Sequence, residues 1–399
     1  MFGILRNLSV STLSAGILRC TLLYARFLGV VPFGVKRNRF EGKTIWMADN
    51  CLWQKWYSLI LRLMLSSWFC YTYWNVLRII SNGFELMVNV LRFTICLLCA
   101  VCIIVMQIYY GQSLLRLFNR FLRLFRRVCG LSEKRKDKTG FGGVRELVLL
   151  LIKSFCIFHE LFCEWPMLFH STDLFTFSSV LCEMFVGIGA GMVMHSCFVG
   201  FLSLGALFAD FNSYVRHDLR RKLRALELPH DACPNRRHLR AMGYRLDECF
   251  AVYDEIQSVG REFNRLINVP LVISVLVNFS VMAMVSFHAI MFSRTIVSYI
   301  WLVVAKLFLD IAILTIAVHG AVSSSRQIRR LGLENCYVSE HNEWHLKLES
   351  FLLRLNIYEF RVRPLGLFEV SNELILFFLS GLITYLTFII QCKLQLKFN

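Results

Sequence analysis

The strongest constraint on this chain is a series of seven apolar segments, each long enough to cross a lipid bilayer as a helix. A spanning helix needs roughly 20 mostly apolar residues. The segments cover residues 53–77, 86–110, 147–168, 175–208, 269–292, 295–321 and 370–392. Only 18% of the residues are charged, whereas about 25% is usual in soluble domains. The sequence therefore predicts an all-α membrane protein with seven transmembrane helices.

The apolar segments are not equally well defined. The third contains Lys153 and Glu160 and is the weakest of the seven. The fourth is longer than a bilayer requires, so we expect it to continue into the cytoplasm. Residues 17–34 are also apolar but contain two arginines, and we interpret them as a helix that lies on the membrane surface.

The basic residues are distributed unevenly between the two sides of the predicted membrane. Of the 44 Lys and Arg residues, 35 lie in four alternate hydrophilic parts, 1–52, 111–146, 209–268 and 322–369, and four lie in the opposite parts. Because cytoplasmic loops are enriched in Lys and Arg, we predict a cytoplasmic N-terminus and an extracellular C-terminus. Since the net charge of +17 is spread between apolar segments rather than clustered in one domain, it does not indicate a nucleic-acid partner.

The predicted orientation bears on the class of receptor. G-protein-coupled receptors also have seven spans, but their N-terminus is outside the cell. A receptor that signals through G proteins stays open as the alternative, because an error of one span would reverse the predicted orientation.

The cytoplasmic loops show helical patterns of their own. Residues 114–128 place four apolar side chains at helical spacing on one side and four arginines on another. The apolar set is Leu115, Phe118, Leu122 and Phe125, and the basic set is Arg116, Arg120, Arg123 and Arg127. We therefore expect the spans to continue into a packed intracellular helical region.

Several ionisable residues lie inside the predicted spans, where charged groups usually face a protein interior or a water-filled cavity. Lys306 and Asp310 are four residues apart in the sixth span, so they share one helix face and can pair. One interpretation is a buried pair that holds the bundle together. The other is a polar pocket among the second to sixth spans that admits a ligand from outside. The candidate ligand-binding residues are Arg92, Glu160, Glu183, His288, Tyr299, Trp301, Lys306 and Asp310.

The sequence shows no catalytic motif and predicts neither an enzyme nor a metal or cofactor site. The stretch "GIGAGM" (187–192) lies inside a span with no preceding strand, so its glycines indicate close helix packing rather than nucleotide binding. His341 and His345 lie one helical turn apart, but no third ligand is apparent nearby, and a zinc site needs at least three protein ligands.

The last apolar segment carries most of its polar residues on one side, and Ser371, Asn372, Tyr385 and Lys393 fall outside it. On a helical wheel of about 100° per residue, seven polar residues fall within a sector of about 80°. This polar stripe consists of Glu369, Glu373, Ser380, Thr384, Thr387, Gln391 and Gln395. Several copies of the helix around an axis would line a wet path with the stripe, and its acidic inner end would favour cations. The alternative is that the stripe packs against the other six helices of the same chain.

The C-terminal motif resembles the signature of insect gustatory receptors. In "TYLTFIIQ" (384–391), Thr384, Tyr385 and Gln391 match the Thr-Tyr pair and the Gln of that signature, but Cys392 stands where the family has Phe. The preceding "GLFEVSNELILFFLSGLI" (366–383) is also similar to that family, as is the seven-span layout with basic cytoplasmic loops.

The resemblance implies a ligand-gated, non-selective cation channel in the plasma membrane, assembled as a homo- or heterotetramer around the seventh helix. In such receptors a small-molecule tastant, here expected to be a bitter compound, binds among the other helices. The implied pore-lining residues are Glu373, Ser380, Thr384, Thr387, Gln391 and Cys392. Cys392 would take the place of the gate aromatic, so either a leaky homomer or a partner subunit that supplies the Phe is expected.

The expected organisation has five parts. They are a cytoplasmic N-terminal segment (1–52), a six-helix ligand-binding bundle (53–321), a cytoplasmic anchor region (322–369), the pore-lining helix (370–392) and an extracellular tail (393–399).

Overall fold

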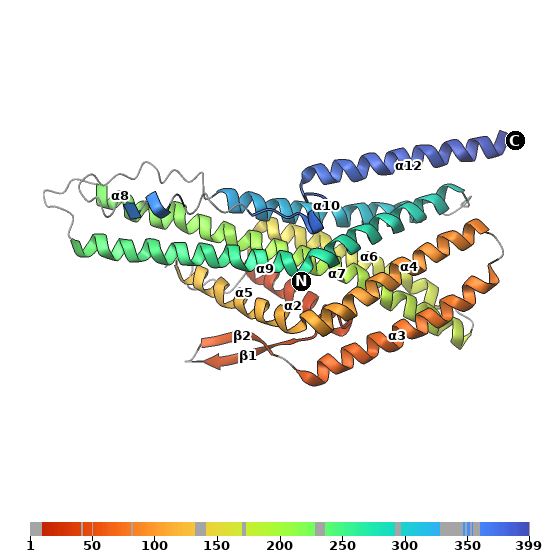
Figure 1. Ribbon diagram of the computed structural model, residues 1–399, viewed down its shortest axis with the longest axis horizontal. Coiled ribbons are helices and arrows are strands. Elements are labelled where there is room, and N and C mark those ends of the chain that lie inside the picture. The colour runs from red at the N-terminus through yellow and green to blue at the C-terminus, as the bar shows by residue number, and fades with distance from the viewer. Residues whose placement is uncertain are drawn as a thin grey trace, which may run out of the picture.

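The computed structural model describes residues 10–40, 43–49, 51–80, 83–131, 141–169, 173–227, 236–291, 297–327, 346–347, 349–351, 353 and 360–398. Within these ranges each of the seven predicted spans coincides with a helix. The helices are α3 (Leu52–Ile79), α4 (Gly83–Val105), α6 (Val144–Phe169), α7 (Leu174–Tyr214), α9 (Arg236–Met291), α10 (Val297–Gln327) and α12 (Asn372–Phe398). They form one elongated helical bundle (Figure 1). The predicted all-α membrane fold is confirmed.

Five helical stretches in the described part of the chain are long and apolar enough to cross a membrane. They are Asn89–Leu131, Leu174–Leu223, Arg240–Phe287, Trp301–Gln327 and Asn372–Gln395. The helices α3 and α6 are not among them, and each holds a buried basic residue, Arg62 in α3 and Lys153 in α6. The weak apolar character predicted for the third segment is therefore seen in α6.

Two of the helices are much longer than a bilayer is thick. At a rise of 1.5 Å per residue, the 41 residues of α7 extend about 60 Å and the 56 residues of α9 about 85 Å, against about 30 Å of hydrocarbon. A π-helical turn, η3 (Val215–Leu219), joins α7 to α8 (Arg220–Glu227). A second, η1 (Met106–Tyr110), joins α4 to α5 (Gly111–Leu131). The parts of these helices that continue beyond the bilayer, which we call the extensions, form a helical region at one end of the bundle, on the left in Figure 1.

The hydrophobic core is built around α7, which packs against α9 and α10. Phe201, Phe208 and Phe211 on α7 are fully buried. The ring of Tyr253 on α9 lies 6.3 Å from that of Phe208 and 6.0 Å from that of Phe211, measured between centroids. The ring of Phe360, in the segment before α12, lies 6.1 Å from that of Phe208. The segment that leads into α12 thus packs into the hydrophobic core between α7 and α9.

Helix α5 buries a different face from the one predicted. Leu115, Phe118, Leu122 and Phe125 are only half-buried, and the fully buried side chains are Leu117, Leu124 and Val128. The physical reason is that α5 is covered by α9, by α7 and by an N-terminal β-hairpin. The three buried side chains belong to the main core with α7 and α9, whereas Leu115 and Phe118 pack on a smaller cluster that includes the N-terminal segment.

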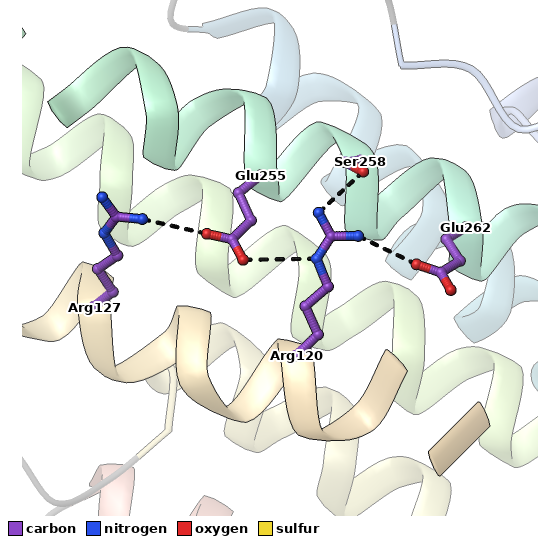
Figure 2. A network of polar contacts seen from close by, with 5 residues as sticks. All are labelled: Arg120, Arg127, Glu255, Ser258 and Glu262. Atoms are coloured by element: carbon purple, nitrogen blue, oxygen red, sulfur yellow. Dashed lines mark hydrogen bonds and ion pairs between the residues drawn. The ribbon is translucent and has the colours of Figure 1, made fainter. Parts of the chain in front are cut away.

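Two arginines of the predicted basic side of α5 bind α9 (Figure 2). Arg120 donates to Glu262 at 3.3 Å and to Ser258 at 3.2 Å, and its Nε lies 3.6 Å from Glu255. Arg127 donates to the other oxygen of Glu255 at 3.4 Å. This network crosslinks the two helices in the extended region.

The N-terminal part contains a helix that the sequence indicated and a β-hairpin that it did not. Helix α2 (Val10–Phe27) covers most of the stretch predicted as a helix on the membrane surface, and it lies along α6 and touches α7. Strands β1 (Gly34–Phe40) and β2 (Lys43–Asp49) form an antiparallel hairpin. The side chain of Asn119 on α5 accepts from the backbone N–H of Ala48 at 2.7 Å and donates to its carbonyl at 3.0 Å. It thereby provides hydrogen-bond partners for the two backbone groups of Ala48 on the outer edge of β2.

Arg62 holds the end of α2 against the bundle. It is 1% exposed, donates to the carbonyl of Leu28 at 2.6 Å, and lies 5.0 Å above the ring of Phe185. A cation at a helix C-terminus is also favoured by the helix dipole. A Cβ at Gly189 would lie 2.8 Å from the guanidinium. This glycine of "GIGAGM" therefore makes room for a charged side chain, whereas the sequence had suggested packing between helix backbones.

Candidate functional site

Four charged side chains meet in the middle of the bundle and form a chain of ion pairs. Lys306 Nζ on α10 lies 2.9 Å from Glu160 Oε2 on α6 and 2.9 Å from Asp310 Oδ2, one turn along α10. Lys153 on α6 pairs with the other oxygen of Asp310. The order is therefore Lys153–Asp310–Lys306–Glu160, with no net charge. We call these four residues the charge chain.

The charge chain lines a small pocket between α2, α6, α7 and α10. The other lining residues are Tyr24, Cys156, Ile157, Leu161, Ile188, Gly191 and Met192. Its free space is about 10 Å³, close to what one water molecule needs. A Cβ at Gly191 would lie 3.1 Å from Glu160 Oε1, so this glycine gives the carboxylate its room. An organic ligand can occupy the pocket only if side chains move.

The structure brings together three of the eight residues predicted to bind a ligand. Glu160, Lys306 and Asp310 all line the pocket, and the predicted pairing of Lys306 with Asp310 is confirmed. Lys153 and Tyr24 join them although the sequence had not placed them in the site. The charge of Lys153 inside a span was a usable signal, but nothing local to Tyr24 indicates that α2 reaches this point.

The other predicted ligand-binding residues lie elsewhere or are not described. Trp301 packs with Met282, Val304 and Leu382, where α9, α10 and α12 meet. Glu183 is a half-buried residue of α7 and does not line the pocket. The side chains of Arg92, His288 and Tyr299 lie outside the described part of the structure, as do His341 and His345. Ligand binding by Arg92, His288 and Tyr299 stays a prediction.

A buried histidine lies beside the pocket on α7. His195 is 1% exposed, and neither ring nitrogen has a hydrogen-bond partner among the described residues. Its ring lies 5.9 Å from that of Phe198. The sequence analysis did not single out His195, because a lone His in an apolar span carries no distinguishing pattern.

Helix α12 lies at the edge of the bundle, against α9 and α10 (Figure 1). Its buried face consists of Leu374, Phe378, Leu382 and Ile389. Phe378 packs on Phe279 of α9 with a centroid distance of 5.4 Å, and Tyr385 donates to the carbonyl of Ala283 at 3.1 Å. These contacts fix which side of α12 faces its own chain.

The polar stripe points away from the chain's other helices. Its members on α12 are all exposed, namely Glu373, Ser380, Thr384, Thr387, Gln391 and Gln395. Thr384 donates to the carbonyl of Ser380 and Thr387 to that of Ile383, each at 2.9 Å. The hydroxyls therefore bond to their own turn, while the stripe as a whole has no packing role within the chain. The side chain of Cys392 lies outside the described part.

The inner end of the stripe differs from the prediction at Glu369. The chain makes a tight turn at Pro364–Gly366 and α12 begins only at Asn372, so Glu369 lies before the helix and not on its wheel. Arg363 donates to Glu369 at 3.0 Å and 2.8 Å. The acidic end of the stripe is thus Glu373 alone. Leu365 in the turn has a φ of 51° and donates from its backbone to Asn268 of α9 at 2.8 Å.

Comparison with known proteins gives a consistent result. The family model of the 7tm chemosensory receptors matches residues 18–396. The putative gustatory receptors 93c and 93b of Drosophila melanogaster are 44% and 40% identical to this chain over 98% of its length, and the match covers 98% and 97% of theirs. The gustatory receptor for bitter taste 93a from the same species is 25% identical over 70% of this chain and 69% of its own.

Solved structures share the fold at low sequence identity. The insect olfactory receptor OR5 from Machilis hrabei matches 94% of this chain and 97% of its own, with a TM-score of 0.62 and 14% identity. The same receptor in complex with eugenol matches 95% and 98%, with a TM-score of 0.61 and 13% identity.

Proposed function

We propose that this chain, which belongs to the 7tm chemosensory receptor family and is related to Drosophila gustatory receptors, is a ligand-gated, non-selective cation channel of the plasma membrane. Members of this family are receptors, so the chain is not an enzyme. The observation that carries the proposal is the exposed polar stripe of α12. A helix that showed Thr, Ser, Gln and Glu side chains to lipid would be unfavourable, because polar groups in hydrocarbon lack partners.

Assembly of several copies removes this difficulty. Four α12 helices around one axis would turn their stripes toward a common wet path, with Glu373 at the cytoplasmic entrance and Gln391 near the extracellular end. A ring of carboxylates at an entrance attracts cations. The pore-lining set is then Glu373, Ser380, Thr384, Thr387 and Gln391, and Cys392 is proposed for the position of the gate aromatic.

The test is ligand-evoked current in cells that express the chain. We expect Gln391→Ala and Thr384→Val to change conductance or ion selectivity, since both side chains would line the path. Leu379→Ala is the matched control, because Leu379 is an exposed residue of α12 outside the stripe. Currents that are identical in the two stripe variants and the wild type would reject the pore assignment.

The ligand is proposed to be a small organic tastant, with a bitter compound as the first candidate. The name of the relative 93a as a receptor for bitter taste and the complex of OR5 with eugenol support this choice. The binding site is proposed at the pocket beside the charge chain, where side chains from four helices converge.

A heteromer is a second form of the same proposal, motivated by Cys392. A smaller side chain in place of the Phe of the family signature favours a partner subunit that supplies the aromatic. Current on co-expression with another gustatory receptor, together with silence of this chain alone, would support the heteromer. Full ligand-gated current from this chain alone would reject it.

A further inference from the structure

The charge chain is asymmetric, and its Glu160 end is the accessible one. Asp310 and Lys306 each have two partners of opposite charge, whereas Lys153 and Glu160 each have one among the described residues. The side chain of Glu160 is 22% exposed, compared with 11% for Lys306, 5% for Asp310 and 4% for Lys153. The pocket therefore presents one carboxylate that is held at a single point.

We propose that Glu160 binds the cationic group of the ligand, and that the receptor's ligands at this pocket are protonated amines. This inference rests on the proposed function, since it names the ligand class of the proposed binding site. When an ammonium group takes Glu160, Lys306 keeps its second partner, Asp310, at 2.9 Å. Each charged group then keeps a partner of opposite sign, with the two lysines sharing Asp310, so the exchange leaves no buried charge unpaired.

The same geometry disfavours an anionic ligand. A carboxylate that approached Lys306 would lie beside both Glu160 and Asp310, whose oxygens are each 2.9 Å from the ammonium. To avoid this repulsion the carboxylate would have to displace Glu160, which would then lose its one partner among the described residues. A neutral ligand gains nothing from breaking the bond between Lys306 and Glu160. Of cationic, anionic and neutral ligands, only a cation gives Glu160 a new ion pair in place of the one with Lys306.

The walls of the pocket define the rest of the ligand. Leu161, Ile188 and Met192 supply apolar surface, and Tyr24 supplies an aromatic ring, which attracts a cation when it lies over the face. Gly191 keeps the space next to Glu160 Oε1 free of a side chain. Because the present free space is about 10 Å³, a ligand can enter only if the flexible Lys306 side chain releases Glu160 while it keeps its contact with Asp310. The expected ligand is an apolar or aromatic body with one ammonium group.

Binding to the purified full-length protein in detergent tests the inference without any need for current. The probes are 2-phenylethylammonium, the neutral 2-phenylethanol and the anion 3-phenylpropionate, each at millimolar concentration. A ligand that binds the native state raises the melting temperature. We expect the ammonium probe to raise it, and the alcohol and the carboxylate to have little effect. Equal shifts from the ammonium and alcohol probes would overturn the inference.

Variants identify the residue. Glu160→Gln should weaken binding of the ammonium probe roughly tenfold or more, because it removes a charged hydrogen-bond acceptor. Glu255→Gln is the control and should bind as the wild type does, since this carboxylate belongs to the network between α5 and α9 and does not line the pocket. Gly191→Ala keeps all four charges and places a methyl 3.1 Å from Glu160 Oε1, so it too should weaken the ammonium probe, even if Glu160→Gln fails to fold. Unchanged binding in Gly191→Ala, or in a folded Glu160→Gln, would contradict the assignment.

Failure here is distinct from failure of the proposed channel. Ammonium-selective binding in a protein that conducts neither alone nor on co-expression with another gustatory receptor would reject the channel and support the site. Ligand-gated current evoked by neutral compounds, with no ammonium-selective binding, would support the channel and reject the site.

Discussion

At the scale of single residues, the charged groups inside the bundle are held by specific partners. The charge chain balances two lysines against two carboxylates, and Arg62 instead binds a backbone carbonyl and an aromatic ring. Small residues accompany these groups, because Gly189 and Gly191 leave the space that Arg62 and Glu160 occupy. A substitution at any of these positions should therefore act through the charge that it exposes or displaces.

Neutralising the centre of the charge chain should strongly destabilise the fold. Asp310→Asn leaves the ammonium groups of Lys153 and Lys306 without the anion between them, and breaking a buried pair costs about 3–5 kcal/mol. We expect a severe loss of monodisperse protein in detergent chromatography. The double variant Lys153→Met with Asp310→Leu removes one charge of each sign and should recover much of the yield. A normal yield for Asp310→Asn alone would argue against this account.

Adding one methyl group at Gly189 should loosen the N-terminal segment. Gly189→Ala places a Cβ 2.8 Å from the guanidinium of Arg62, which must move and lose its bond to Leu28. We expect the free energy of unfolding to fall by about 1–3 kcal/mol, as in other overpacked cores. Gly16→Ala in α2 is the control, since nothing lies within 4 Å of the added atom. Thermal melting in detergent measures both, and equal melting temperatures would refute the role of Gly189.

At the scale of elements, the transmembrane helices could be predicted from the sequence and the N-terminal hairpin could not. Apolar length is a local property, so each of the seven segments already identified its helix. Strand β1 reads Gly-Val-Lys-Arg-Asn-Arg-Phe, with no apolar alternation over most of its length, and β2 is held by Asn119, which lies 71 residues beyond Ala48. No local pattern contains such a pairing. The inner end of the polar stripe could not be predicted either, because a helical wheel does not show that the helix starts after Glu369.

The candidate pocket could also be predicted only where its contacts lie within one helix. The spacing of Lys306 and Asp310 within one helix predicts their pairing, which the structure confirms. Their partners Glu160 and Lys153 come from α6 and depend on how two helices pack. Tyr24 depends on where α2 packs, which the sequence pattern did not specify. Contacts within an element could be inferred, and contacts between elements required the structure.

The crosslink between α5 and α9 should contribute modestly and in a salt-dependent way. Arg120→Ala removes contacts to Glu255, Ser258 and Glu262, all partly exposed, so we expect a loss of about 1 kcal/mol in the free energy of unfolding. Salt screens such pairs, and the difference from the wild type should shrink at high ionic strength. Arg123→Ala, on an exposed position of the same helix, should have no comparable effect. Identical behaviour of the two variants in melting curves would show that the network does not stabilise the fold.

At the scale of the whole molecule, the odd number of spans places the two ends of the chain on opposite sides of the membrane. The basic extensions identify the cytoplasmic side. We expect a tag at the C-terminus to be stained by antibody on intact cells, and a tag at the N-terminus only after permeabilisation. The reverse pattern would remove the pore geometry and favour a receptor that signals through G proteins.

The assembly predicts that α12 helices of different subunits approach one another along the stripe. Thr384 is exposed in the single chain and would face the common axis, and a disulfide between two introduced thiols there requires their Cα atoms to approach to about 4.4–6.8 Å. In a background with Cys20 and Cys392 replaced by Ser, Thr384→Cys should therefore yield oxidant-dependent dimers on a non-reducing gel. Leu302→Cys on α10 is equally exposed to the surroundings of the chain but lies outside the stripe, so it should yield few. Dimers of equal amount from both variants would indicate random collision in the membrane, and their absence from Thr384→Cys would place α12 away from the axis.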